Sequence, residues 1–274
     1  MTRYRASAGL TNDWQHFRFE QDAGVATVTL NRPEKMNPLT FESYADLRDL
    51  LLELPHTDAR VLVIKGEGKG FCGGGDVNEI IGELLKMDAK DLMGFTKMTG
   101  DAIRAMRECP LPIISSIQGI AAGAGSVVAL ASDFRVCSTT ARFAFLFTKV
   151  GLSGGDMGAA YLLPRAIGYT RATELLMLGD TIDAQTAQSY GLVSKLVENE
   201  NLAAETASLA QRLATGPYLA YSQTKSLITR ELDMPIGPAM ELDAMTQALL
   251  MTTHDHSEFH AAFNAKRAPQ WEGR

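Results

Sequence analysis

The sequence of 274 residues has few cysteines, no excess of basic residues and no long apolar run. Its three cysteines, Cys72, Cys109 and Cys137, are odd in number and lack metal-ligand spacing, which argues against a zinc site and a disulfide framework. The net charge of -6 argues against a nucleic-acid partner. Because no run approaches the roughly 20 apolar residues that span a bilayer, we expect no membrane partner.

The chain also lacks an export signal and a central histidine. Residues 1–13 are polar and contain no apolar signal segment, so we expect a cytoplasmic protein. The five histidines, at positions 16, 56, 254, 256 and 260, all lie outside the glycine-rich centre of the sequence. This distribution argues against a serine–histidine nucleophile and against a metal-centred reaction.

Two loops of small residues are the most informative features that the sequence does contain. Residues 70–76 follow an apolar, strand-like run, and residues 119–126 follow another. Such turns let backbone N–H groups approach a ligand, and a helix that begins there leaves its first donors unpaired. Two of these turns together can hold one oxygen anion. The alternative for each loop is tight packing of a helix on a strand.

Short strands alternate with helices up to about residue 200, which predicts a layered α/β core. A hairpin is predicted from strands at 17–20 and 25–30, and Thr40 is the predicted cap of a helix that runs to about residue 54. Further strands are predicted at 61–65, 113–117, 134–136 and 192–197, with helices over much of 78–108 and from the second loop to about 131.

Residues 201–274 are predicted to form a helical C-terminal region, separate from the core at 1–200. Helices are expected at 202–214, 218–230, 238–250 and 257–264. Pro238 suits the first position of a helix. The apolar residues of 238–250 follow helical spacing, which indicates either core packing or a subunit interface.

In this order, the motifs resemble the enoyl-CoA hydratase/isomerase family, also called the crotonase family, over about residues 17–273. The segments that carry the resemblance are 30–33, 70–76, 112–125, 131–133, 191–193 and 263–269. The resemblance implies a ββα spiral core with a C-terminal helical trimerisation region. It also implies an acyl-CoA thioester as substrate and a homotrimer or dimer of trimers. No cofactor is implied, since coenzyme A is part of the substrate.

The resemblance assigns the oxyanion site to two backbone N–H groups, those of Gly75 and Ala124. Ala124 stands where many relatives have glycine, but the contact is made through the backbone. The loop residues Cys72, Gly74 and Asp76 are expected to line the substrate site beside them.

Hydratases of this family use two glutamates, and here those positions are Val127 and Phe147, which we expect to line the acyl group. Asp156 is the acid that remains nearby, twelve residues before Gly168. By that count, dienoyl-CoA isomerases, ring-epoxide CoA isomerases and 4-chlorobenzoyl-CoA dehalogenase also have an aspartate at this place. We therefore predict Asp156 as the catalytic residue. Its alternative role is the N-cap of the following helix.

One carboxylate can remove a proton from one carbon of an enolisable acyl-CoA and return it to another, so double-bond isomerisation is the favoured reaction. Three alternatives stay open: hydration with Asp156 and a backbone-held water, hydrolysis with Asp156 as nucleophile, and a scaffold that binds CoA esters without turnover. Dehalogenation is disfavoured, because the dehalogenase tryptophan position is Phe147 and its histidine position falls near Gly100.

Coenzyme A requires positive charge for its phosphates. The resemblance points to Arg32 and Lys35, in the loop after the hairpin. Lys266 and Arg267 are predicted to reach the ligand of a neighbouring subunit. The alternative for each of these residues is solvated surface charge.

Overall fold

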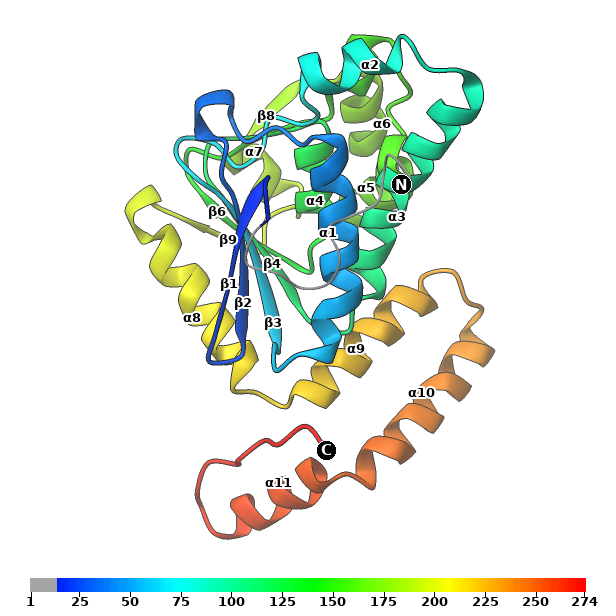
Figure 1. The fold of residues 1–274 in the computed structure, drawn as a ribbon. Helices are drawn as coiled ribbons and strands as arrows, with labels where there is room; N and C mark the ends of the chain where they lie inside the picture. The colour runs from blue at the N-terminus through cyan, green and yellow to red at the C-terminus, as the bar shows by residue number, and fades with distance from the viewer. Residues whose placement is uncertain (1–13) are drawn as a thin grey trace.

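The computed structural model describes residues 14–274 (Figure 1). The predicted lack of an export signal falls on residues 1–13, outside this range. A six-stranded sheet, in the order β1-β2-β3-β4-β6-β9, lies at the centre. The predicted hairpin is confirmed as the antiparallel pair β1–β2, and the other neighbours are parallel. Its strands are β1 (Phe17–Asp22), β2 (Val25–Leu30), β3 (Val61–Gly66), β4 (Ile113–Ile117), β6 (Phe134–Ser138) and β9 (Lys195–Val197).

A second, three-stranded sheet stands beside the first and has the order β5-β7-β8. Its strands are β5 (Ile120–Ala122), β7 (Arg142–Ala144) and β8 (Thr181–Asp183), none of which the sequence predicted. β5 follows β4 and β7 follows β6, so that two consecutive strands enter different sheets before the next helix begins. This arrangement is the predicted ββα core.

Eleven α-helices and six short turns occupy the rest of residues 14–274. The helices are α1 (Phe41–Glu53), α2 (Gly82–Leu84), α3 (Ala89–Glu108), α4 (Ala124–Ala131), α5 (Ala159–Ile167), α6 (Tyr169–Leu178), α7 (Ala184–Ser189), α8 (Leu202–Ala214), α9 (Tyr218–Glu231), α10 (Ile236–Met251) and α11 (His254–Asn264). The 3-10 turns are η1 (Pro33–Lys35), η2 (Leu54–His56), η4 (Leu146–Val150), η5 (Asp156–Gly158) and η6 (Asn199–Asn201), and η3 (Val77–Ile81) is a π turn. No helix within the described range is long and apolar enough to cross a bilayer.

Helices cover both faces of the six-stranded sheet, and this explains why β3 is apolar at consecutive positions. Val61 and Val63 pack with residues of α8, whereas Leu62 and Ile64 belong to the main core, which includes α1, α3 and α4. Figure 1 shows α8 and α1 on opposite sides of the sheet. Helix α8 belongs to the predicted C-terminal region, 201–274. It nevertheless packs on the six-stranded sheet of the core.

The remaining C-terminal helices are attached through α9. Its Lys225 ammonium lies 2.8 Å from the Asp133 carboxylate and donates to the carbonyl of Leu111. Beyond α9, the helices α10 and α11 extend away from the core (Figure 1). Their large apolar side chains Met240, Met245, Leu249, Phe259 and Phe263 are all at least half exposed. The sequence allowed either core packing or a subunit interface for the apolar residues of α10. Core packing within this chain leaves these side chains exposed.

Several predicted element boundaries are wrong, and α11 begins at His254 rather than at 257. The late strand begins at Lys195 rather than 192, because the N–H group of Leu192 bonds the carbonyl of Ala187 instead of a neighbouring strand. Pro238 is the third residue of α10, since Pro235 is the N-cap and Ile236 is the first helical residue. The first turn tolerates a proline there because its N–H groups have no partner within the helix.

Candidate active site

The first glycine loop is fixed on both sides by backbone hydrogen bonds. On one side, the N–H of Leu39 donates to the carbonyl of Gly74 over 2.7 Å, and the N–H of Asp76 donates to the carbonyl of Leu39. On the other side, Cys72 pairs with Ala121 of β5. The side-chain amide of Asn37 donates to two carbonyls within and before the loop, each at 2.9 Å. The loop is therefore a rigid part of the core.

The second loop turns directly into α4 and is locked against the first. Gly123, the N-cap of α4, has a φ of 49°, a conformation that favours glycine. The Ser126 hydroxyl donates to the carbonyl of Ala121. A Cβ atom on Gly125 would lie 2.5 Å from the carbonyl oxygen of Cys72, so only glycine allows this approach. The structure thus gives both loops a shared packing role, and the presentation of amides to a ligand stays a prediction.

The N–H groups of Gly75 and Ala124 lie on neighbouring backbone segments. A Cβ atom on Gly74 would be 3.6 Å from the Ala124 nitrogen, which places the Gly74–Gly75 peptide against the first turn of α4. Within the described part of the chain, neither amide donates a hydrogen bond to the backbone. The structure therefore brings the two predicted donors together and leaves both available to a ligand.

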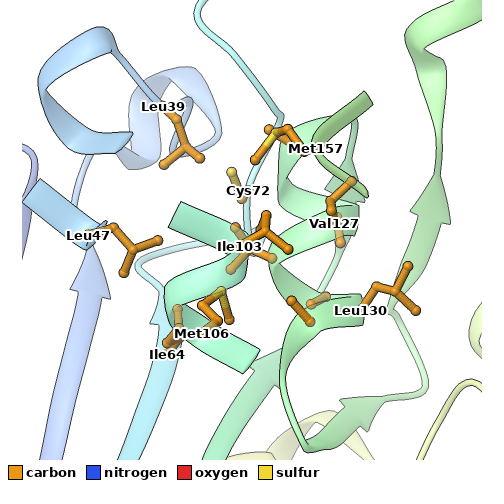
Figure 2. Close-up of a cluster of buried hydrophobic side chains, with 14 of the residues drawn as sticks. Leu39, Leu47, Ile64, Cys72, Ile103, Met106, Val127, Leu130 and Met157 are labelled. Atoms are coloured by element: carbon orange, nitrogen blue, oxygen red, sulfur yellow. The ribbon is translucent and has the colours of Figure 1, made fainter. Parts of the chain in front are cut away.

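The wall beneath these amides is apolar. Val127 is fully buried and Phe147 is 8% exposed, so neither position where the family's hydratases have glutamate offers a carboxylate. Figure 2 shows Val127, Cys72 and Met157 within one buried cluster. Burial raises the pKa of the Cys72 thiol to about 12. Cys72 is therefore a neutral part of the wall and not a thiolate nucleophile.

Asp156 is presented by the tight turn η5, which packs against α3 and α4. The next residue, Met157, has a φ of 52°, and its N–H group donates to Asp156 Oδ1 over 2.9 Å. The other carboxylate oxygen, Oδ2, has no hydrogen-bond partner among residues 14–274. Burial raises the pKa of Asp156, and the hydrogen bond from Met157 opposes this rise.

The alternative role of Asp156 as N-cap of the following helix is wrong. The N-cap of α5 is Gly158, and no side chain bonds the first amides of that helix. Asp156 lies three residues before the first residue of α5, so its carboxylate does not cap the N-terminus of that helix. One carboxylate oxygen is thus available for chemistry.

Tyr44 of α1 lies beside the first loop, and sequence reasoning did not single it out. Its hydroxyl oxygen lies 3.6 Å from the position that a Cβ atom would take on Gly75. Burial raises its pKa well above the usual value, and the charges of Cys72 and Asp156 raise it further. A tyrosine on the buried face of a helix has the pattern of a core residue, so no sequence signal separated it from its neighbours.

The two cations predicted to bind phosphate both lie at the start of η3. The Arg32 guanidinium is 2.7 Å from Glu79 and 3.2 Å from Asp76, and the Lys35 ammonium lies 3.7 Å from Glu79. Burial acts to raise the pKa of Asp76, but the amides of Glu79 and Asn78 and both cations outweigh it and lower that pKa. Asp76 therefore caps η3 and neutralises part of the positive charge.

Lys266 and Arg267 follow α11, apart from the core (Figure 1). Lys266 is exposed, whereas Arg267 forms an ion pair with Glu258. The single chain does not bring Lys266 together with Arg32 or Asp156.

Among residues 14–274, no group of three or more histidine, cysteine or acidic side chains is placed to hold a metal ion.

Comparisons with known proteins agree with this geometry. The family model described as enoyl-CoA hydratase/isomerase matches residues 20–274. The 1,2-epoxyphenylacetyl-CoA isomerase of Escherichia coli K12 is 34% identical over 92% of this chain and 97% of its own length. The (E)-benzylidenesuccinyl-CoA hydratase of Thauera aromatica is 35% identical over 91% of this chain and 96% of its own.

A solved structure from Streptomyces coelicolor A3(2), named provisionally as an enoyl-CoA hydratase, superposes with a TM-score of 0.95. It is 60% identical and covers 100% of both chains. The family model, the relatives and the fold therefore lead to one assignment. The chain belongs to the enoyl-CoA hydratase/isomerase family.

Proposed function

We propose that this protein isomerises a double bond in an acyl-CoA thioester, with Asp156 as the sole acid and base. Members of the family act on acyl-CoA thioesters. The observation that carries the proposal is the partly buried carboxylate of Asp156, on a turn that packs against α4, together with apolar residues at both usual glutamate positions. The E. coli relative, named as an isomerase, supports the same reaction type.

In the proposed mechanism, the N–H groups of Gly75 and Ala124 bind the thioester oxygen. The Asp156 carboxylate removes a proton from one carbon of the acyl group, and the electron pair moves onto that oxygen as a dienolate. The same carboxyl group then returns the proton to another carbon, so no atom is gained or lost. Preorganised backbone donors typically contribute about 10²–10³ in rate each.

The raised pKa of Asp156 suits this shuttle, because a general base works best when its pKa lies nearer the operating pH. Isomerisation requires the group to accept a proton and to release it again within one turnover. A strongly acidic carboxylate would accept the proton poorly. The burial of Asp156 raises its pKa, so the carboxyl group holds a proton more readily than an exposed carboxyl group.

Hydration is the second candidate function, because the Thauera relative is named as a hydratase. In that reaction Asp156 and a backbone group would hold the attacking water. The glutamate pair that usually performs this task is replaced by Val127 and Phe147, which cannot transfer protons. Hydrolysis with Asp156 as nucleophile and binding without turnover remain alternatives that the experiment below separates.

For the rest of the substrate, we propose that Arg32 and Lys35 bind coenzyme A phosphates. The substrate would compete with Asp76 and Glu79 for these cations. We further propose a homotrimer or dimer of trimers through α10 and α11, whose exposed apolar residues lack a cover within the chain. Lys266 would then reach the ligand of a neighbouring subunit. No cofactor is required, because every proton transfer in this mechanism uses Asp156.

The test is incubation of the purified protein with a panel of enoyl-, dienoyl- and aroyl-CoA esters, followed by mass and ultraviolet measurement. Isomerisation predicts an unchanged mass with an ultraviolet shift. A gain of one water would identify a hydratase, and release of free coenzyme A would identify a hydrolase. Tight binding with no chemical change for any ester would support the scaffold and reject the enzyme.

A further inference from the structure

A second cavity lies at the other end of helix α4 from the candidate oxyanion site. Its volume is about 650 Å³, which is within the range of ligand pockets, and residues of β6, α5, α8 and α9 complete its walls. Leu130, near the C-terminal end of α4, lines the cavity. At about 1.5 Å per residue, Leu130 lies roughly 9 Å along the helix from Ala124. Gly75, Ala124 and Asp156 do not line this cavity, so it is separate from the candidate active site.

Basic side chains outnumber acidic ones around this cavity. Asp133 is the single acidic residue among the described residues that line it, whereas five lining residues are basic, namely Arg107, Arg135, Arg165, Arg212 and Lys225. The Asp133 carboxylate lies 3.1 Å from Arg107 and 2.8 Å from Lys225, and Arg165 pairs with Asp233 at 2.8 Å. Two carboxylates thus serve three cations. Arg135 and Arg212 have no carboxylate at ion-pair distance within residues 14–274.

Arg135 is held in place by backbone carbonyls and not by a counter-ion. Its Nε donates to the carbonyl of Leu192, and its Nη1 donates to the carbonyls of Ala129, Leu130 and Ser132 at the end of α4. Nη2 takes part in none of these bonds. Burial lowers the pKa of Arg135, but a guanidinium stays charged at any working pH. A positive charge therefore faces the cavity without a neutralising partner, an arrangement that a bound anion would stabilise.

The other walls of the cavity are mostly apolar. Leucine and isoleucine side chains from four helices line it, namely Leu130, Leu162, Leu209, Leu213, Ile228 and Leu232. A small hydrated anion would leave this apolar surface in contact with water, whereas a ligand with an apolar body would cover it. Guanidinium groups form strong, charge-assisted hydrogen bonds with carboxylates. The cavity thus combines recognition of one carboxylate with space for an apolar body.

We propose that this cavity binds a free carboxylic acid with an aliphatic or aryl body, in its carboxylate form. The carboxylate pairs with Arg135 and Arg212, and the body lies against the leucines of α8 and α9. A CoA thioester of the same acid has no carboxylate, so the site recognises the free acid alone. The inference goes beyond the reaction proposed at Asp156 and does not depend on it, because the two sites share no residue.

The test is calorimetry at neutral pH on the purified full-length protein, as it assembles in solution, with three probes. Decanoate, below its micellar concentration, has both the carboxylate and the apolar body. Decanamide has the same chain without the charge, and inorganic phosphate has charge without a chain. We expect decanoate to bind about 10–100-fold more tightly than either of the other probes, because only decanoate supplies both interactions.

Variants of lining residues then locate the bound decanoate. Arg212→Gln removes a cation and Ile228→Trp fills the cavity, and each should weaken decanoate binding by about 10-fold or more. Both residues are exposed, so these variants should fold. Arg135→Gln should also weaken binding, but it removes a donor from the end of α4, so the exposed variants decide the outcome. Arg230→Gln, on α9 and outside the cavity lining, is the matched control and should leave the affinity unchanged.

Equal affinity for decanoate and decanamide would overturn the inference, because the cavity would then be an apolar cleft without anion recognition. Phosphate that binds as tightly as decanoate would overturn it too, since the apolar walls would contribute nothing. Unchanged decanoate affinity in Arg212→Gln and Ile228→Trp would place the ligand elsewhere and reject the site. Failure of the native protein to bind decanoate would also reject it, as expected if a second copy of the chain covers the cavity.

Discussion

Replacing Gly125 with alanine is expected to separate the two loops that present the Gly75 and Ala124 amides. The new Cβ atom would lie 2.5 Å from the carbonyl oxygen of Cys72 and 2.6 Å from its Cβ. Nonbonded carbon contacts are optimal near about 3.5–4.0 Å, so the loops must move apart by roughly 1 Å. A displacement of this size at a catalytic group can cost about 10²-fold in rate.

The expected loss in kcat/KM for Gly125→Ala is therefore about 10²–10³-fold, the value typical of one lost oxyanion donor. Overpacking should also lower the free energy of unfolding by about 1–3 kcal/mol, to be measured in urea. Adding Cys72→Ala should not restore activity, because the carbonyl oxygen and Cβ of Cys72 remain. Gly237→Ala, where a Cβ meets nothing within 4 Å, is the control and should leave turnover unchanged.

The experiment uses the CoA ester that the native protein converts, with circular dichroism to confirm that each variant is folded. A folded Gly125→Ala variant with native turnover would refute the reasoning, because the amide pair would then tolerate a shift that should abolish its geometry. Rescue by Cys72→Ala would also contradict the structural account, since it would show that only the thiol opposes the new methyl group.

Three further predictions concern the supports of the site. Asn37→Ala should lower the free energy of unfolding in urea by about 1–3 kcal/mol, because buried carbonyls of the first loop lose their donor; an unchanged midpoint would refute this. Asp156 has a raised pKa in the folded protein, so its charge destabilises the fold as pH rises through and above the unfolded value. Asp156→Asn should therefore be more stable than the native protein at neutral pH, and thermal melts should show this advantage vanish in acid; equal stability at neutral pH would contradict it. Arg32→Glu should raise the dissociation constant of a CoA ester in calorimetry, and an unchanged constant would reject Arg32 as a phosphate ligand.

Much of the scaffold was predictable because local chemistry and tertiary structure agree. The first helix has a Thr40–Ser43 capping box, which satisfies its first amides wherever the helix packs. The β1–β2 hairpin follows from alternation about Gly24, whose φ is 79°. Small residues in both loops predicted close backbone approach, and Gly125 against Cys72 shows why bulk is excluded there.

Other features depend on contacts that no local pattern records. β5 has three residues and is a strand because β7 and the first glycine loop lie beside it. Asp76 is predicted to line the substrate site, and the structure adds that its carboxylate caps η3 and pairs with Arg32. The place of Tyr44 became visible only in the structure, where its hydroxyl oxygen lies 3.6 Å from the position of a Cβ atom on Gly75. In each case a residue far away in the sequence contributes to the role.

The most direct test of the central claim is turnover by Asp156→Asn on the ester that the native protein isomerises. The asparagine can still accept the hydrogen bond from Met157, so the loop should keep its structure. We predict a fall in kcat of about 10²–10⁴-fold, the usual contribution of a general acid–base group, with ester binding retained. Native turnover by this folded variant would contradict the account, because no other group has been assigned to carry the proton.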